Sequence, residues 1–185
     1  VLEGMILAAL FVGARRGIVY IRHEYPEQIE AVLAAIGRAR ELGVCGERIL
    51  GTDRSFALEV FVSPGGYICG EQSALIEAMA DKRSQPRNRP PELATNGYRD
   101  KPTLVNNVET LCNIKHIIAM GGAEYARLGR PNNTGTRVLC VSGDVQRPGY
   151  FEVEVGAVTM GQLIYEMAGG LRPGRKLKAV IPGGS

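Results

Sequence analysis

Apolar and polar positions alternate with two different periods along the first part of the chain, and this predicts alternating helices and strands. Residues 2–12 are almost continuously apolar and are followed by Gly13, as expected at the end of a buried helix. The β-branched run at 17–22 and the run at 55–62 predict two strands. Strands and helices that alternate at these lengths are typical of an α/β layer.

Two amphipathic helices are predicted around the second strand. Residues 26–43 carry Pro26 near their start and Gly43 at their end, which is the expected polarity of a helix. A shorter helix is expected from about Glu71 to Ala80, directly after a glycine-rich loop. The apolar stripe of the longer helix is predicted to consist of Ile29, Val32, Leu33, Ile36 and Leu42.

Residues 81–103 show no periodicity and contain four prolines, so we expect a long ordered loop or a linker. Because loops of this length in compact domains are often functional, the segment is a candidate for binding. Helical spacing returns in residues 104–122, which end in two glycines. The apolar positions of this helix are Val105, Val108, Leu111, Cys112 and Ile118.

A different pattern begins near Asn133. Residues 136–156 read as two strands joined by turns, and a helix is expected to start at Thr159 and to stop at Gly169. A further strand is predicted over 176–184. A hairpin, a helix and a strand in this order indicate an α+β unit of the β-grasp type.

We therefore expect two domains with a boundary near residues 125–134. Residues 1–128 form an α/β domain, and residues 134–185 form a β-grasp domain that is truncated at its end. The chain starts without Met inside an apolar segment and stops directly after a strand-like run. Both ends look cut, so a fragment of a longer protein is expected.

Composition narrows the function only a little. The 185 residues are 45% hydrophobic and 22% charged with a net charge of +3, which is ordinary for a globular protein and too small to indicate nucleic-acid binding. The apolar runs are too short to span a membrane. Four cysteines without a C-x-x-C pair, together with two histidines, favour reduced thiols and no metal site within this chain.

The loop and helix start "GGYICGEQSALIEAM", residues 65–79, are the first candidate for ligand binding. The glycines also suit an ordinary strand-to-helix turn, and the pattern is neither a P-loop nor a dinucleotide fingerprint. A helix N-terminus commonly receives a phosphate, yet here the sequence supplies its own acid, Glu71. This pattern suggests a ligand that offers hydrogen-bond donors.

Two further segments are open to both a structural and a functional interpretation. Asn106 and Asn107 are suitable helix caps, and their amides also suit a uracil-like edge or a ribityl hydroxyl. The basic residues near the prolines suit a solvated surface or a nucleotide phosphate. These basic residues are Lys82, Arg83, Arg87 and Arg89.

The motifs "GGYICGEQSALIEAM", "KRSQPRNRPP" and "KPTLVNNVETL", in this order, closely resemble the NADH-oxidising flavoprotein subunits of respiratory complex I. The same module recurs in NAD-reducing hydrogenases and NAD-dependent formate dehydrogenases. The segment "SGDVQRPGYFEVEVG" and the residues after it resemble a soluble-ligand-binding β-grasp domain. The resemblance covers essentially the whole chain.

The resemblance implies a Rossmann-like layer that binds FMN, accepts a hydride from NADH and passes single electrons to an iron–sulfur cluster. The implied activity is that of an NADH:quinone oxidoreductase with FMN and NAD(H) as cofactors. The positions that match cofactor contacts of this family are Tyr67, Gly70, Glu71, Gln72, Arg89, Asn106, Asn107 and Thr110.

The resemblance also implies what this chain lacks. In the family a glycine-rich phosphate-binding loop lies upstream of these motifs, and the cysteines of the [4Fe-4S] cluster lie downstream. The chain alone is therefore expected to be inactive, with no catalytic residue and no metal ligand of its own. The implied partners are the other subunits of the complex, notably the [2Fe-2S] subunit, at the cytoplasmic side of the inner membrane and without insertion into it.

Two motifs depart from the family pattern on the expected NADH side. Gln72 stands where a second glutamate contacts the nicotinamide, and Glu92 stands where a phenylalanine stacks on the adenine. Arg89 replaces a lysine and keeps its charge with a different geometry. Losing a stacked aromatic costs on the order of 1–3 kcal/mol. Our hypothesis is that the protein binds FMN normally and uses NADH weakly, or takes electrons from another donor.

Two alternatives stay open at this point. The first is the same module in an NAD-linked hydrogenase or formate dehydrogenase. The second treats the β-grasp part, residues 134–185, as a non-catalytic module that docks subunits.

Overall fold

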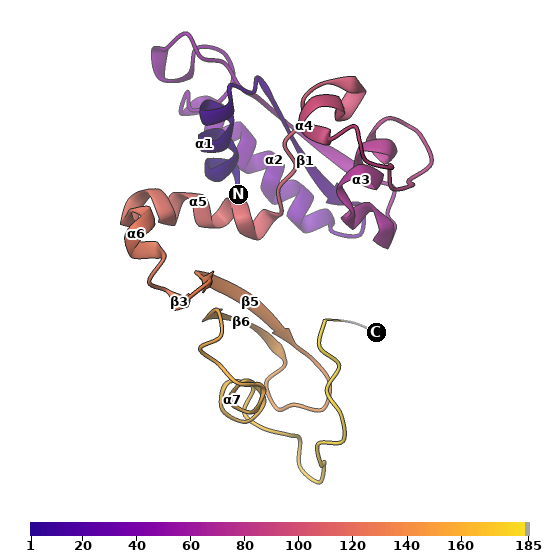
Figure 1. Ribbon diagram of the computed structural model, residues 1–185, viewed down its shortest axis with the longest axis vertical. Helices are drawn as coiled ribbons and strands as arrows, with labels where there is room; N and C mark the ends of the chain where they lie inside the picture. Colours follow the sequence, from indigo (N-terminus) through magenta and orange to yellow (C-terminus); the bar gives the residue numbers. More distant parts are fainter. Residues whose placement is uncertain (184–185) are drawn as a thin grey trace. The chain divides into compact units, whose positions relative to one another are not determined.

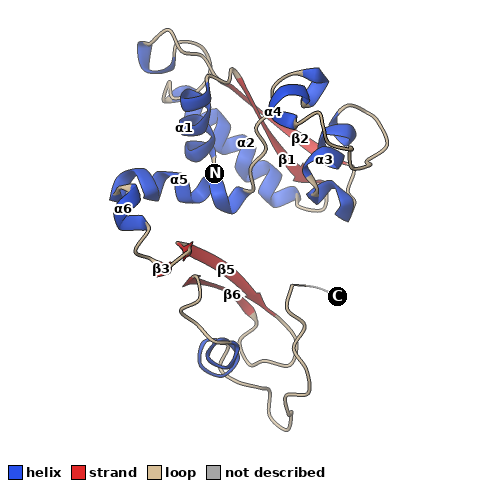
Figure 2. Ribbon diagram, in the orientation of Figure 1, coloured by secondary structure: helices blue, strands red, loops and turns tan. Residues whose placement is uncertain are grey.

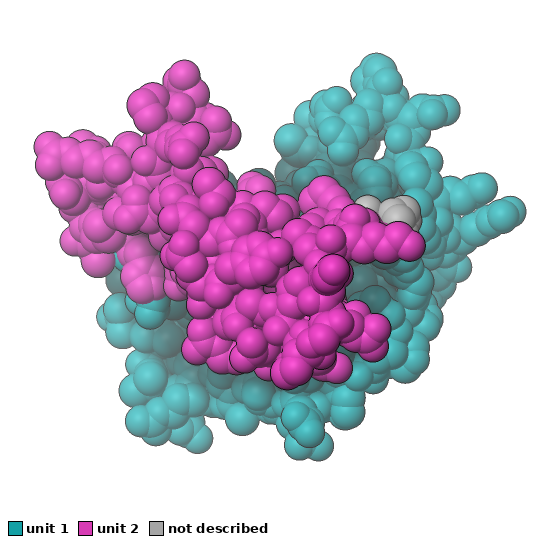
Figure 3. Space-filling model, turned by 90° about the horizontal axis from the view of Figure 1, so that it is seen from below, with its two compact units in different colours: residues 1–115 teal, residues 116–185 magenta. Residues whose placement is uncertain are grey.

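The computed structural model describes residues 1–183, and these fall into two compact units. The first unit is Val1–Lys115 and the second begins at His116. Figure 3 shows the two units in separate colours. The division falls inside a helix, and the domain limits expected from the sequence stay a prediction.

A parallel pair of strands forms the centre of the first unit. Strand β1 (Arg16–Arg22) pairs with β2 (Ala57–Ser63), and helix α2 (Pro26–Glu41) connects them (Figures 1 and 2). The register joins Arg16 to Ala57 and Arg22 to Ser63, so both strands end at the same edge of the sheet. These three elements confirm the predicted strand–helix–strand order.

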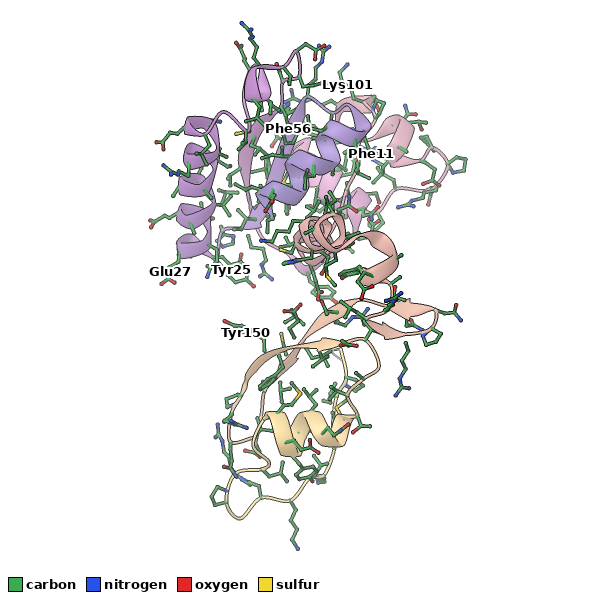
Figure 4. All side chains as sticks on the ribbon, turned by 90° about the vertical axis from the view of Figure 1, so that its left-hand side faces the viewer. Phe11, Tyr25, Glu27, Phe56, Lys101 and Tyr150 are labelled. Atoms are coloured by element: carbon green, nitrogen blue, oxygen red, sulfur yellow. The ribbon has the colours of Figure 1, made fainter. Side chains whose placement is uncertain are left out.

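Helix α1 (Leu2–Val12) packs against the same core and ends at Gly13, which has a φ of 74°. Phe56 and Leu58 are the most buried apolar side chains of this core, at 2% and 1% exposure, and Figure 4 labels Phe56 inside the unit. Phe11, on the outer side of α1, is 92% exposed. The predicted end of this helix is confirmed.

The predicted apolar stripe of α2 is wrong at two positions. Leu33 and Leu42 are 51% and 57% exposed, whereas Ile36 and Ala39 are buried. Because Ala39 is small, the helix can approach the core along the Ile36–Ala39 line, and this rotation turns Leu33 outward.

The segment between β2 and the last long helix of the unit contains several short elements. After the turn η2 comes helix α3, which starts one residue later than predicted. The loop predicted over 81–103 contains two helical turns, so it is not free of regular structure. The bounds are η1 Ile49–Gly51, η2 Tyr67–Gly70, α3 Gln72–Met79, α4 Leu93–Asn96 and η3 Tyr98–Asp100.

Helix α5 (Val108–Met120) contacts α1 through a residue without a side chain. A Cβ atom at Gly4 would lie 1.9 Å from the carbonyl oxygen of Leu111, so only glycine permits this approach. Of the predicted apolar stripe only Leu111 is buried, while Val108 and Ile118 are 53% and 62% exposed. The stripe is wrong at these two positions and at Cys112, which is exposed as well. The contact with Gly4 of α1 covers the helix at Leu111.

An antiparallel hairpin forms the centre of the second unit. Strands β5 (Thr136–Val141) and β6 (Gly149–Glu154) pair as predicted. Thr159 caps the following helix in a capping box with Gln162, which confirms the predicted start. Val145, Ile164 and Ala168 make the small core. The remaining elements are α6 Gly122–Tyr125, β3 Gly129–Arg130, β4 Asn133–Thr134, α7 Met160–Gln162 and the π-helical turn η4 Leu163–Met167.

The strand predicted over 176–184 is wrong in its described part, because residues 176–183 belong to no strand; Gly184 lies outside the described residues. Val180 and Ile181 are 42% and 70% exposed. An apolar run becomes a strand only when a neighbouring strand binds its backbone groups, and no such neighbour lies beside this run within residues 1–183. No helix of the described part is long and apolar enough to cross a membrane.

Candidate functional site

The glycine loop connects β2 to α3 and has a backbone that only glycine adopts readily. Gly65 and Gly66 have φ values of 96° and 108°, a region that side-chain-bearing residues rarely occupy. A Cβ atom at Gly65 would also lie 3.0 Å from Cε1 of His23. These glycines therefore bring the chain tightly past the ends of both strands.

A cleft of about 510 Å³ opens at this edge of the sheet. Its walls are Tyr20 and Arg22 of β1, Ser63 at the end of β2, and the whole loop from Gly66 to Glu71. The volume lies in the range of small-molecule sites. Ligands of open α/β sheets bind outside the carboxyl ends of parallel strands, and the cleft lies at such ends.

Glu71 is the acid that starts α3, and its carboxylate caps the helix. Oε2 accepts a hydrogen bond of 2.8 Å from the backbone N–H of Ala74 and one of 2.6 Å from the hydroxyl of Ser73. The hydrogen bond from the Ser73 hydroxyl lowers the pKa of Glu71 most strongly. Burial opposes this effect, and the helix N–H groups and the positive charge of Arg89 lower the pKa further. Glu71 is therefore a carboxylate, and both bonds end on one of its oxygens.

Ser63 forms the buried floor of the cleft. It is 1% exposed, donates a hydrogen bond of 2.7 Å to the Tyr20 hydroxyl and accepts one of 3.1 Å from the N–H of Gly65. Burial and the neighbouring Cys69 raise the pKa of Tyr20, so this phenol stays neutral. The floor thus ties the glycine loop to both strands.

An arginine–glutamate pair lies at the rim of the cleft. Arg22 Nε donates a hydrogen bond of 3.2 Å to Glu24 Oε2, and the guanidinium lies 5.8 Å from the ring centre of Tyr25. The hydrogen bond from Arg22 lowers the pKa of Glu24 to about 2. The Arg22 charge is therefore held in place and partly neutralised.

The basic loop after α3 is fastened to the start of that helix. The N–H of Arg87 donates a hydrogen bond of 2.8 Å to Ser73 Oγ, the same hydroxyl that binds Glu71. The Arg87 side chain binds Glu77 and donates to the carbonyl oxygen of Asn96 at 2.8 Å. The part of the loop around Arg87 is thus attached to the first turn of α3, next to Glu71.

The structure brings together only some of the residues predicted from the sequence. Tyr67, Gly70 and Glu71 line the cleft, and Tyr67 is 95% exposed. Arg89 does not line it, although its charge acts on Glu71 and its side chain pairs with Glu92 at 3.2 Å. The predicted residues that do not line this cleft are Gln72, Arg89, Asn106, Asn107 and Thr110.

Asn107 has a local role in the structure. Its side-chain oxygen accepts a hydrogen bond of 2.8 Å from the N–H of Glu109 at the start of α5. This is the capping interpretation of the asparagine pair. Sequence reasoning missed Tyr20, Arg22 and Ser63, and the available signal was their position at the predicted ends of two neighbouring strands.

Comparison with known proteins finds a family match over the first unit. The sequence model of the family described as the Nuo51 FMN-binding domain matches residues 1–116. The chain is 42% identical over 183 residues to an NADH-quinone oxidoreductase subunit of Rhizobium meliloti, covering 99% of this chain and 43% of that protein. It is 41% identical over 184 residues to the NADP-reducing hydrogenase subunit HndC of Solidesulfovibrio fructosivorans, covering 100% of this chain and 37% of that protein.

The fold is also similar to a solved structure. The NAD+-reducing [NiFe]-hydrogenase in the H2-reduced state matches 91% of this chain and 28% of its own chain, with a TM-score of 0.81 and 40% identity. The chain thus spans less than half the length of these relatives.

Proposed function

Because the chain belongs to the family of the Nuo51 FMN-binding domain, we propose that it forms one side of the electron-input site of an NADH-oxidising flavoprotein. FMN, when bound, would supply the chemistry by accepting a hydride from NADH and releasing single electrons. The observation that carries this proposal is the Glu71 carboxylate, which lies in the wall of a cleft of suitable size at the carboxyl ends of two parallel strands.

The residues of the cleft fit the polar edge of a flavin or nicotinamide ring. Oε2 of Glu71 already accepts two hydrogen bonds from α3, so we assign Oε1 to donors of the ligand. Tyr67 offers an exposed aromatic face beside it, and the neutral Tyr20 phenol supports the floor. The chain's own part is therefore to bind and orient the rings.

The charges around this cleft favour phosphate binding less than they favour ring binding. Glu71 fills the helix N-terminus that could receive an anion, and Arg22 and Arg89 are each engaged by a glutamate. Asn106, Asn107 and Thr110, at the start of α5, stay proposed FMN contacts on the resemblance of their motif. Gln72, the first residue of α3, stays a proposed contact on the nicotinamide side.

The surroundings of the site follow from the relatives and are part of the same proposal. We infer a Rossmann-like layer for residues 1–128, a β-grasp domain for residues 134–185, and an iron–sulfur cluster bound by residues outside this chain. The proposed complex is a respiratory NADH:quinone oxidoreductase, with a [2Fe-2S] subunit as neighbour, attached at the cytoplasmic face of the inner membrane.

A second candidate is the same module in an NAD-linked hydrogenase. The similarity to the subunit HndC and to the NAD+-reducing [NiFe]-hydrogenase supports this candidate. The electron acceptor of such a complex would differ from quinone. The ring-binding role of the cleft is the same in both cases, so quinone reduction by the purified complex distinguishes them.

An anaerobic absorbance spectrum tests the proposal. The flavoprotein subunit that contains this chain is purified, and its spectrum is recorded before and after NADH is added. A flavin band that NADH bleaches is the expected result. A preparation without flavin would refute the proposal, and a bound flavin that NADH fails to bleach would point to another electron donor.

A further inference from the structure

The basic loop reaches the cleft through one shared hydroxyl group. Ser73 Oγ donates to Glu71 Oε2 at 2.6 Å and accepts from the Arg87 backbone N–H at 2.8 Å. Arg89 follows Arg87 by two residues, so the bridge ties the part of the loop that carries Arg89 to the start of α3. The positive charge of Arg89 accordingly contributes to the lowered pKa of Glu71.

The two arginines of this loop have different environments. Arg87 has a side-chain exposure of 22%, binds Glu77, and donates to the carbonyl oxygens of Asn96 and Gly97 at 2.8 and 3.3 Å. These bonds fix Arg87 within the fold. Arg89 has a side-chain exposure of 46%, and its one ion pair within the described residues is with Glu92.

Another anion can displace Glu92 from Arg89 easily. Its atoms are 3.2 Å apart, and the Glu92 side chain is 58% exposed. Exposed pairs of this kind contribute little to stability, because water screens both charges and both side chains lose entropy. A phosphate that approaches Arg89 would therefore compete with Glu92 at low cost to the fold.

We propose that Glu92 is an internal counter-anion of Arg89 that weakens the binding of an anionic nucleotide on the side of Glu71 where the basic loop is attached. This inference rests on the proposed function, because that function supplies the phosphate-bearing ligand. Glu92 acts through Arg89: it occupies a guanidinium donor and removes the net positive charge that the phosphate would meet. The ring-binding part of the cleft does not depend on it.

The variant Glu92→Gln tests the proposal in the flavin-loaded enzyme, with flavin content matched between samples. We expect the KM for NADH to fall about two- to fivefold, the effect of an exposed charge pair, with kcat unchanged. The KM of this variant should also rise more steeply with salt concentration, because an unpaired Arg89 then meets the phosphate. A purely structural effect would not change the salt dependence.

A double-mutant cycle tests whether Glu92 acts through Arg89. In the Arg89→Gln background the KM for NADH should be higher, and adding Glu92→Gln should then change it by less than the single variant does. The matched control is Glu41→Gln on α2. Arg38 and Glu41 form a pair with the same order and spacing, 3.4 Å apart and 70% exposed, and removing this carboxylate should leave the KM unchanged.

Several results would overturn the inference. An unchanged KM in Glu92→Gln would do so, as would an equal effect of this change with and without Arg89, which would mean that Glu92 repels the ligand directly. If NADH reduces the flavin and the KM does not respond, the inference alone fails. An enzyme that NADH does not reduce would overturn the proposed function together with it.

Discussion

Glu71 is predicted to hold the helix with one carboxylate oxygen and the ligand with the other, and the substitution Glu71→Gln separates these two tasks. The change keeps the length of the side chain and removes its charge. One amide oxygen remains and can still accept the hydrogen bonds of Ala74 and Ser73. The amide nitrogen would then face the cleft, where it offers a donor in place of an acceptor.

The two effects differ in size. Helix capping by the amide oxygen is retained, so the loss consists of the charge near the helix N-terminus and of a weaker bond to Ser73, roughly 1 kcal/mol in the free energy of unfolding. A ligand donor loses a hydrogen bond to a charged acceptor, which is worth about 1.5–3 kcal/mol. We therefore expect flavin affinity to fall about ten- to 150-fold while the fold survives.

The stability effect should depend on pH in a defined direction. The pKa of Glu71 is lower in the folded protein than the ordinary value of 4.5, because the Ser73 hydroxyl and the helix N–H groups stabilise the charged form. The contribution of Glu71 to stability is thus fully present above pH 4.5 and is lost as the pH falls through the lowered pKa. The Glu71→Gln variant lacks this contribution, so its stability should approach that of the wild type in acid.

Two measurements on the flavoprotein check this reasoning. Urea unfolding followed by circular dichroism gives the stability, and quenching of flavin fluorescence gives the affinity. The matched control is Glu27→Gln, since Glu27 lies in the first turn of α2 (Figure 4) and no hydrogen bond of its side chain appears within residues 1–183. Unchanged flavin affinity in Glu71→Gln would refute the division of tasks. An equal stability loss in Glu27→Gln would mean that the loss comes from the charge at a helix N-terminus alone, and would refute the contribution of the bond to Ser73.

Three further substitutions test the packing, two at glycines and one at the floor of the cleft. Gly4→Ala should destabilise the protein by about 2–3 kcal/mol in urea unfolding, because its Cβ would lie 1.9 Å from the Leu111 carbonyl oxygen. In contrast, Gly37→Ala has open space around its Cβ and should stabilise helix α2 by about 0.5–1 kcal/mol. Ser63→Ala should cost about 1–3 kcal/mol and weaken flavin binding, because it leaves the Gly65 N–H and the Tyr20 hydroxyl without their buried partner. Equal urea midpoints for the two glycine variants, or a wild-type midpoint for Ser63→Ala, would contradict these arguments.

The sequence predicted where helices begin and end better than which of their faces are buried. Pro26 and Gly13 mark a helix start and a helix end in the structure as they do in the sequence, because both act through local backbone geometry. The exposure of Leu33 was not predictable in this way, since it depends on the rotation of α2 against a core that other segments supply. The strand predicted at 176–184 failed in its described part for the same reason: pairing needs a partner that periodicity cannot identify.

The site shows the same limit. Tyr67, Gly70 and Glu71 are neighbours in sequence, and their motif predicted that they act together. Tyr20 lies on β1, 43 residues before Ser63 in the chain. The parallel pairing of β1 with β2 brings its hydroxyl to that serine. Motif reasoning therefore finds a loop, and pairing between strands is needed to find the wall opposite it.

The distribution of charge around the cleft argues that ring recognition and phosphate recognition are separate tasks here. Glu71 occupies the helix N-terminus in the wall of the cleft, where an anion would be attracted, and Glu92 pairs with Arg89 and reduces its charge. If both glutamates acted only by lowering the positive potential, Glu71→Gln and Glu92→Gln would both strengthen nucleotide binding. Because Glu71 is bonded into the helix start and lines the cleft, we expect opposite signs: weaker flavin binding in the first variant and tighter NADH binding in the second.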